Sequence, residues 1–386
     1  MDFVYMDNAS GTRLLEEVFE EMAPYFKTDF GNPSSIHTAG TKPKNAVEHA
    51  REQVAELVGA LPKEIYFTSC GSESNNFAIK GAAFAHEKKG RHIVVSAVDH
   101  QSVLNAAKSL TRLGWEVTAV DVDDKGFVDP NNVADAIRED TAVVSVISAS
   151  NEIGTIQNIK EIASVVKEKG IPFHTDAIQT AGVLPVNVDE LGVDMLSLAA
   201  NSFYGPKGAA ALYIREKVRV FSLIDGGIQE RGRRGGTENV PAIAGLGKAA
   251  EIAIRNMDAR IAATKALRDK LMTGLESAIP KIQVNGDREK RLPGNVHISV
   301  EAVEGESMLF SLAGQGIMAA SGSSCADKAL KSSHVLAAIG CDPALANASI
   351  LFSLGFDNTE AEVDKVIEVL PPIIVKLRAM SPIWNG

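Results

Sequence analysis

Short runs rich in β-branched and aromatic residues alternate with amphipathic helical stretches through the first two thirds of this chain. The runs that predict strands cover 64–69, 92–97, 115–122, 142–148 and 172–176. The stretches that predict helices between them include 75–89, 131–139 and 159–170. Strands that alternate with helices in this way favour a mostly parallel sheet with helices on both faces. The chain is therefore predicted to have an α/β fold.

The pattern changes near Asp258, where a long charged helix over 259–278 is followed by strands and helices in a different rhythm. A chain of 386 residues is also long for a single core. We therefore predict a large α/β domain over 17–257. A smaller α+β domain is predicted to combine 1–16 with 258–386.

Composition narrows the class of protein. A net charge of −10 argues against nucleic acid or an anionic membrane as the main partner. The sequence has no run of 18 apolar residues and no basic segment followed by an apolar stretch at its start, so we expect neither a membrane span nor a signal peptide. The three cysteines have no CxxC spacing, which disfavours a disulfide framework or a self-contained zinc site. A cytoplasmic protein is expected.

Ligands of such sheets usually lie beyond the carboxyl ends of the strands, so the polar residues there are candidates for a site. The segment 68–76 opens a helix and offers free amides and hydroxyls to a phosphate, although an ordinary helix cap explains it equally well. His100 and Asn151 each follow a strand, and a lone histidine is more often structural. Asp176 ends an apolar strand, where it either caps a turn or pairs with a buried cation such as a protonated pyridine nitrogen.

Taken together, in order and spacing, these segments resemble the IscS/NifS type of cysteine desulfurase, in the class V family of pyridoxal-phosphate (PLP) enzymes. Further matching segments are FGNPSSIHTAG (30–40), YGPKG (204–208), RGGT (234–237), ASGSSC (320–325) and SPIW (381–384). The resemblance covers essentially the whole chain. It implies the PLP-dependent transferase fold type I, a large domain with a mostly parallel seven-stranded sheet plus a smaller α+β domain, and a homodimer.

The resemblance also implies a role for each matching residue. The cofactor phosphate would be held by Gly71 and Ser72, and Thr237 would reach the phosphate of the partner subunit. Around the ring, His100 would stack, Asp176 would pair with the nitrogen and Gln179 would face the phenolic oxygen, while Asn151 would lie near the substrate carboxylate.

Cys325 would be the nucleophile that takes sulfur from cysteine as a persulfide. Its Gly/Ser-rich loop and the helical pattern that follows place the thiol near a helix N-terminus, which favours the thiolate. The alternative is a small surface residue. By contrast, Cys70 and Cys341 are interpreted as structural.

Four positions depart from the family. Ser202 stands where the family has the lysine that binds PLP covalently, and serine forms no imine and does not move protons at ordinary pH. Beside it, Asn201 replaces a histidine and Ala199 a phosphate-binding serine. Leu351 replaces the arginine that binds the substrate carboxylate. Lys207 is a candidate substitute for the missing lysine, but active members have it too, which favours a structural role.

These departures favour a desulfurase-like homodimer of iron–sulfur cluster assembly with impaired PLP turnover. PLP would be bound weakly and non-covalently or not at all. Cys325 would act as a sulfur acceptor or as one ligand of a [2Fe–2S] cluster shared with an IscU-type scaffold, docked near Trp384. The alternatives are an active PLP-dependent cysteine desulfurase, and a class V enzyme whose substrate lacks a carboxylate.

Overall fold

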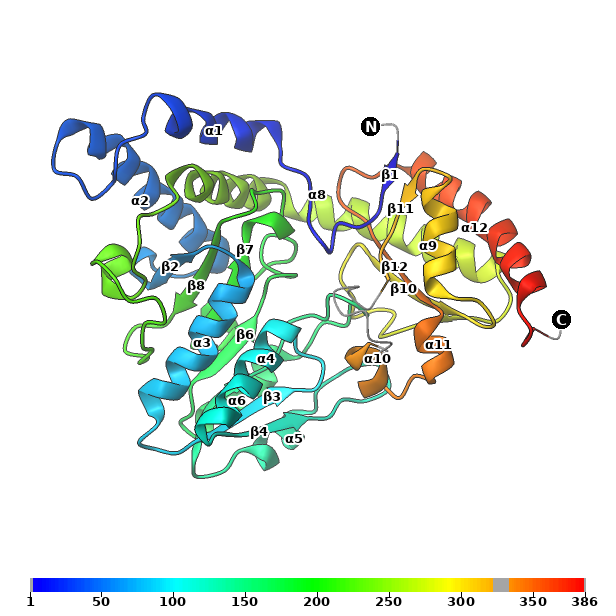
Figure 1. Ribbon diagram of the computed structural model, residues 1–386, viewed down its shortest axis with the longest axis horizontal. Helices are drawn as coiled ribbons and strands as arrows, with labels where there is room; N and C mark the ends of the chain where they lie inside the picture. Colours follow the sequence, from blue (N-terminus) through cyan, green and yellow to red (C-terminus); the bar gives the residue numbers. More distant parts are fainter. Residues whose placement is uncertain (1–2, 322–332, 385–386) are drawn as a thin grey trace.

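The large domain is built on one central sheet (Figure 1). The structure is a computed structural model that describes residues 3–321 and 333–384. Within these residues the sheet has seven strands in the order β2-β8-β7-β6-β5-β3-β4, and all neighbours are parallel except those of β8. The strands are β2 (Ile65–Thr68), β3 (His92–Ser96), β4 (Glu116–Val120), β5 (Thr141–Ser145), β6 (Phe173–Asp176), β7 (Met195–Ala199) and β8 (Ala210–Ile214). The predicted mostly parallel α/β sheet is confirmed.

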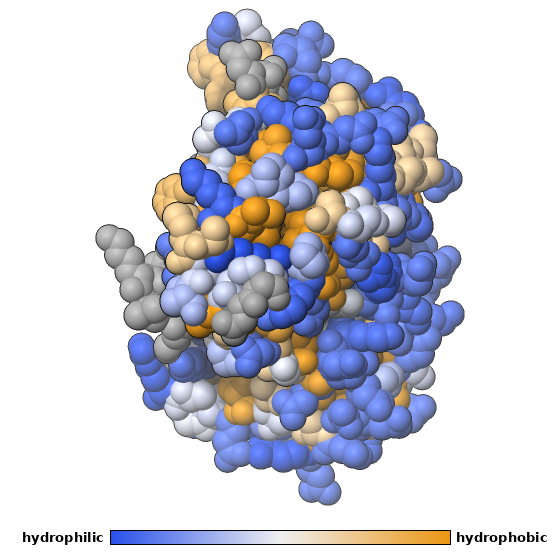
Figure 2. Space-filling model, turned by 90° about the vertical axis from the view of Figure 1, so that its right-hand side faces the viewer, coloured by the Kyte–Doolittle hydropathy of each residue, from blue (hydrophilic) through white to orange (hydrophobic). Residues whose placement is uncertain are grey.

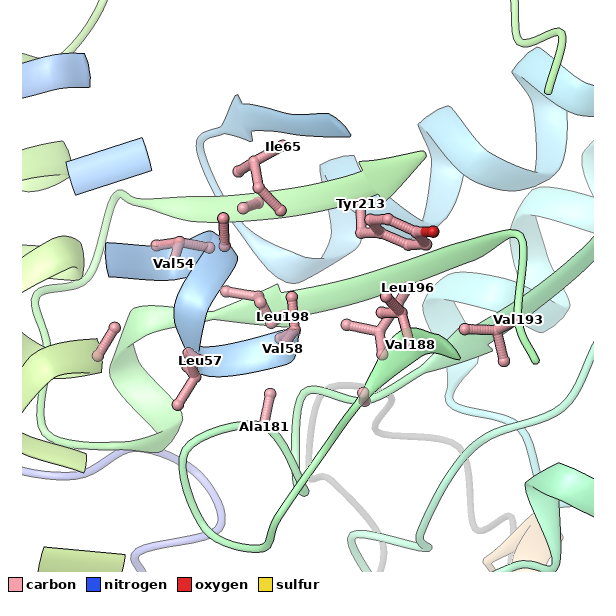
Figure 3. Packing of buried hydrophobic residues seen from close by; sticks show 14 of the residues in the cluster. Val54, Leu57, Val58, Ile65, Ala181, Val188, Val193, Leu196, Leu198 and Tyr213 are labelled. Carbon is pink, nitrogen blue, oxygen red and sulfur yellow. The ribbon is translucent and has the colours of Figure 1, made fainter. Parts of the chain in front are cut away.

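Helices cover both faces of this sheet because successive strand residues point to opposite sides. In β2, Ile65 and Phe67 pack in one hydrophobic cluster and Tyr66 in another. Figure 3 shows part of the first cluster, where Val54 and Val58 of α2 gather near the strand side chains. The helices of the large domain are α1 (Glu16–Lys27), α2 (Thr38–Val58), α3 (Gly71–His86), α4 (Gln101–Leu110), α5 (Pro130–Ala136), α6 (Ile159–Glu168) and α7 (Val188–Leu191). Short 3₁₀ turns are η1 (Pro62–Glu64), η2 (Thr111–Leu113), η3 (Ala200–Ser202) and η4 (Gln229–Gly232).

A second hydrophobic cluster lies around a smaller sheet of order β12-β10-β9, beside the two-stranded pair β1-β11. Val4 and Met6, from the start of the chain, pack in this cluster with residues of the last helix. The strands are β1 (Val4–Tyr5), β9 (Ile282–Val284), β10 (Asn295–Val300), β11 (Ile317–Met318) and β12 (Ser349–Ser353). The helices are α9 (Gly305–Ala313), α10 (His334–Ala338), α11 (Pro343–Asn347) and α12 (Glu360–Met380).

The two clusters are joined by α8 (Val240–Ala278), a helix of 39 residues that runs from one lobe into the other (Figure 1). Its first half, up to Ala253, packs in the large-domain core, and Leu271, Met272 and Leu275 pack in the second cluster. The boundary predicted at 257/258 therefore falls inside a continuous helix and not in a linker.

The five predicted strands all form, and each end agrees within a few residues. None of the helices in residues 3–321 and 333–384 combines the length and apolarity that a membrane crossing requires.

Candidate functional site

A cavity of about 630 Å³ lies beyond the carboxyl ends of the large-domain strands. Its walls carry residues that follow β2, β3, β5, β6 and β7, together with small-domain residues such as Leu309 and Leu351. Parallel strands end at the same edge of a sheet, so the polar side chains that follow them come together there. The sequence-predicted residues that line this cavity are Gly71, Ser72, His100, Asn151, Asp176 and Gln179.

One end of the cavity is suited to an anion. The helix α3 begins at Gly71, and no side chain caps its first turn, so its first amide groups are available to a ligand. A Cβ added at Gly71 would lie 2.2 Å from Cδ1 of Ile178, so a side chain there would require the Ile178 side chain to move. The same Cβ position lies 3.8 Å from Cβ of Ala199, which places Ala199 at this end of the cavity.

Cys70 also lines the cavity and is exposed. The interpretation of this thiol as a structural residue stays a prediction. It precedes α3 as the N-cap residue, in extended backbone, and its side chain makes no capping hydrogen bond.

Asp176 is buried at the floor of the cavity. One carboxylate oxygen accepts a hydrogen bond from the Asn75 amide at 2.7 Å, and the other accepts one from the Ile178 backbone amide at 3.0 Å. Burial raises the pKa of Asp176, while the neighbouring His100 acts in the opposite direction. The carboxylate thus caps the turn after β6 and is also placed to pair with a cationic ring nitrogen.

His100 is held in one orientation. Its Nδ1 accepts a hydrogen bond from the Ser102 backbone amide at 3.1 Å and lies 2.7 Å from the Ser102 hydroxyl. Because Nδ1 accepts from that amide, the neutral ring carries its proton on Nε2. Gln179, across the cavity, donates from Nε2 to the carbonyl oxygen of Ala9 at 3.1 Å.

The four departures from the family face this same cavity. Ala199, Asn201, Ser202 and Leu351 all line it. Leu351 is buried in β12 opposite His297, and its backbone pairs with Ala320 through hydrogen bonds of 2.8 and 3.0 Å. Lys207 is exposed and is not among the described lining residues. Its Nζ lies 4.0 Å from the position that a Cβ would take at Gly11, and the Asn201 amide nitrogen lies 3.7 Å from the same position.

Glu152 is a lining residue that the sequence did not reveal. Its carboxylate is buried and accepts a hydrogen bond from the Ser333 hydroxyl. Burial raises the pKa of Glu152 to about 7, partly offset by that hydrogen bond. The signal in the sequence was weak, since it amounted to one charged residue beside Asn151 in a segment that reads as a loop.

Cys325 lies outside the described residues, which end at Ser321 before it and resume at Ser333 after it. Before the segment, Ala320 and Ser321 line the cavity; after it, Ser333 hydrogen-bonds Glu152. Thr237 is exposed and does not line the cavity of its own chain. Arg234, the first residue of the same RGGT segment, pairs with Glu73 of α3 at 2.8 Å. Within the described residues, no group of three or more histidine, cysteine or acidic side chains is arranged to hold a metal ion.

The SPIW segment is partly packed against its own chain. The Trp384 ring lies under the Arg378 guanidinium, 4.0 Å from the ring centroid, and Lys281 is 5.1 Å away. Trp384 is half-buried, whereas its neighbour Ile383 is exposed.

These residues fit PLP bound without a covalent bond. The cavity, of about 630 Å³, supplies the uncapped start of a helix, a buried carboxylate and the His100 ring. It does not fit covalently bound PLP, because among its described lining residues there is no lysine, nor any arginine, while Asp7, Glu152 and Asp176 supply three carboxyl groups.

Comparison with known proteins gives consistent matches. Residues 4–366 match the family model described as Aminotransferase class-V. "Cysteine desulfurase IscS" of Dictyoglomus turgidum is 49% identical over 379 residues, which cover 98% of this chain and 96% of that protein. The protein of the same name from Methanosarcina thermophila is 48% identical and is matched over 94% of its length, with 98% of this chain covered. A solved structure titled "NIFS-LIKE PROTEIN" superposes with a TM-score of 0.91 at 37% identity, covering 97% of this chain and all of that one.

Proposed function

Because the chain belongs to the class-V aminotransferase family, among its cysteine desulfurases of the IscS/NifS type, we propose that it is a desulfurase-like protein of iron–sulfur cluster assembly with impaired PLP turnover. It acts as a homodimer that docks an IscU-type scaffold. Cys325 is its sulfur acceptor or cluster ligand.

The observation that carries the proposal is that Ser202 and Leu351 line one cavity together with His100 and Asp176. The positions that differ from the family are therefore grouped in one site and are not scattered over the surface. Serine forms no imine. A substrate carboxylate brought against Leu351 loses its hydration without gaining a cationic partner there, a cost of several kcal/mol.

The residues that would hold PLP are Gly71 and Ser72 at its phosphate, His100 and Asp176 at its ring, and Gln179 at its phenolic oxygen. Thr237, exposed on its own subunit, is proposed to reach the phosphate in the partner subunit. When bound, PLP would supply an electron sink that stabilises negative charge on a substrate carbon. The described residues contribute ring orientation and burial, and Asn151 is proposed to lie near the substrate carboxylate.

The role of Cys325 rests on chain connectivity and on chemistry. Of the described residues on either side of its segment, Ser321 lines the cavity and Ser333 hydrogen-bonds Glu152, which lines it. A thiolate is a suitable ligand for iron. One thiolate is not enough for a cluster, since such clusters normally take four protein ligands, so the remaining ligands are assigned to the scaffold.

The small domain offers a surface for such a partner. Figure 2 shows hydrophobic side chains exposed among hydrophilic ones on the side of the molecule that carries this domain. Large exposed hydrophobic side chains of α9, α12 and the C-terminal segment are Phe310, Val375, Met380 and Ile383. Apolar anchors of this kind dominate protein interfaces, and they supplement Trp384, whose ring is partly covered by Arg378.

The test is cluster lifetime in the complex with an IscU-type scaffold, followed by visible absorbance. We expect Cys325→Ser to leave the complex assembled and to make the shared [2Fe–2S] cluster markedly more labile. Cys70→Ser, which removes an exposed thiol from the cavity, and Cys341→Ser are matched controls. Equal lifetimes for the Cys325→Ser and unmodified complexes would refute the ligand role and leave sulfur acceptance.

A second candidate is an active PLP-dependent cysteine desulfurase that delivers persulfide sulfur from Cys325. The retained His100, Asp176 and Gln179 favour it. Borohydride reduction of PLP onto Lys207, together with sulfide release from cysteine, would establish this function. A third candidate, a class V activity on a substrate without a carboxylate, is consistent with Leu351.

A further inference from the structure

A second, smaller cavity adjoins the first. Its volume is about 90 Å³, several times the ~10–15 Å³ that one water molecule needs. The two cavities share Ala9, Asn151, Gln179 and Ser202 as lining residues. The far wall of the second cavity is mainly apolar and comes from α8 and the small domain, with Met257, Ile261, Leu292, Leu354 and Phe356.

Arg260 of α8 lines this cavity and is half-buried. Its guanidinium carbon lies 3.9 Å from the centroid of the Phe356 ring and 6.0 Å from that of Tyr204. Desolvation lowers the pKa of Arg260, yet an arginine remains charged at neutral pH. The cavity thus contains a permanent cation beside an aromatic and aliphatic wall.

The nearby acidic groups are already paired with other residues. Asp357 pairs with Arg13 at 2.7 Å and accepts a hydrogen bond from the Tyr204 hydroxyl at 2.6 Å. Glu17 pairs with Arg255 at 3.1 Å. In the part of the chain that the structure describes, no carboxylate lies within 4.0 Å of the Arg260 guanidinium.

The wall around Arg260 is fixed in place. Tyr204 has a φ of 70°, a left-handed conformation that is unusual for a bulky residue. It is held there by hydrogen bonds from its backbone amide to the Thr12 hydroxyl at 2.7 Å and from the Phe356 backbone amide to its own hydroxyl at 3.0 Å. A ligand would therefore meet a preformed surface, which reduces the ordering cost of binding.

We propose that this second cavity is a binding site for a small aliphatic carboxylate, whose carboxylate pairs with Arg260 and whose hydrocarbon part packs against Met257, Leu354 and Phe356. The planar guanidinium of Arg260 has N–H donors that match the two oxygens of a carboxylate. The apolar wall favours a ligand whose remaining part is aliphatic. Such an acid would lie in a cavity that shares Ser202 with the cofactor cavity. The proposal goes beyond the proposed function and does not depend on it.

The test is calorimetric titration of the purified full chain with 3-methylbutanoate and with its neutral analogue 3-methylbutanamide. The unmodified protein should bind the acid at least about tenfold more tightly than the amide, as expected for a charge-assisted hydrogen bond. Arg260→Met, which keeps much of the side-chain volume, should weaken binding of the acid by a similar factor. Lys265→Met, which removes an exposed cation of the same helix that is paired with Asp269, should change it less than twofold.

Equal affinity for the acid and the amide, no binding of the acid at millimolar concentration, or unchanged binding by Arg260→Met would each overturn the proposal. If Arg260→Met fails to fold, the decision rests on two other measurements. The acid–amide comparison needs no variant, and Arg260→Lys, which retains the charge, should keep a preference for the acid.

Discussion

Glu152 gives a sharp test of the cavity's electrostatics. Its carboxyl is buried, and burial raises its pKa from 4.5 to about 7. Between these two values the folded protein holds a proton that the unfolded chain has released, so stability falls as pH rises. Above pH 7 the folded state must bury an ionised carboxylate. The resulting loss in the free energy of unfolding is roughly 3 kcal/mol, at ~1.36 kcal/mol for each unit by which the pKa is raised.

Glu152→Gln should remove this penalty. The amide does not ionise, and its oxygen can still accept the hydrogen bond from Ser333. We expect the variant to match the unmodified protein closely at pH 5 and to be more stable by up to roughly 3 kcal/mol at pH 8. The assay is urea denaturation at both pH values, comparing midpoints, with Glu168→Gln, an exposed position on α6, as the control. A stability difference that does not grow with pH, or a variant less stable at pH 8, would refute the reasoning.

The remaining predictions concern a buried ion pair and cofactor attachment. Glu230 is buried and accepts two hydrogen bonds of 2.8 Å from Arg51, so Glu230→Gln should lower the free energy of unfolding by about 3–5 kcal/mol in denaturation experiments. As a control, Glu216→Gln, which removes one partner of an exposed ion pair, should lower it by less than about 1 kcal/mol. A loss at position 230 no larger than at position 216 would contradict this. Borohydride should fix no PLP onto the unmodified chain by mass spectrometry, whereas Ser202→Lys should become labelled. That variant should still have a low kcat/KM for cysteine because Leu351 is unchanged, and near-normal turnover would show that the substrate side of the pocket is intact.

The fold could be predicted because each strand can be recognised from its own residues. Runs such as 92–97 and 172–176 are short, apolar and bounded, and they become β3 and β6. The long helix α8 was harder, since its first half is buried in the large-domain core and its second half faces solvent on one side. One continuous helix therefore has two patterns, and the change of pattern reads as a domain boundary.

The residues of the site could be predicted only where they lie at the end of a strand or directly after it. His100 and Asp176 follow strands, and parallel strands bring them to one cavity. Glu152 was missed because its burial depends on Ser333, 181 residues further along the chain. Arg260 looks like any charge on a surface helix, and its lack of an ion pair depends on Arg13 and Arg255 taking the nearby acids.

None of the described residues that line the cofactor cavity is a lysine or an arginine, and this has a consequence for any anion that enters it. Asp7 and Asp176 have raised pKa values caused mainly by burial, as Glu152 does, because no lysine or arginine among the described lining residues offsets the loss of hydration. A phosphate or carboxylate ligand meets the same conditions, so its binding depends on the start of α3 and on groups from outside this lining. Arg260 is a cation that lines the adjoining cavity, as Ser202 does. This difference in charge between the two sets of described lining residues favours an anionic ligand in the smaller cavity.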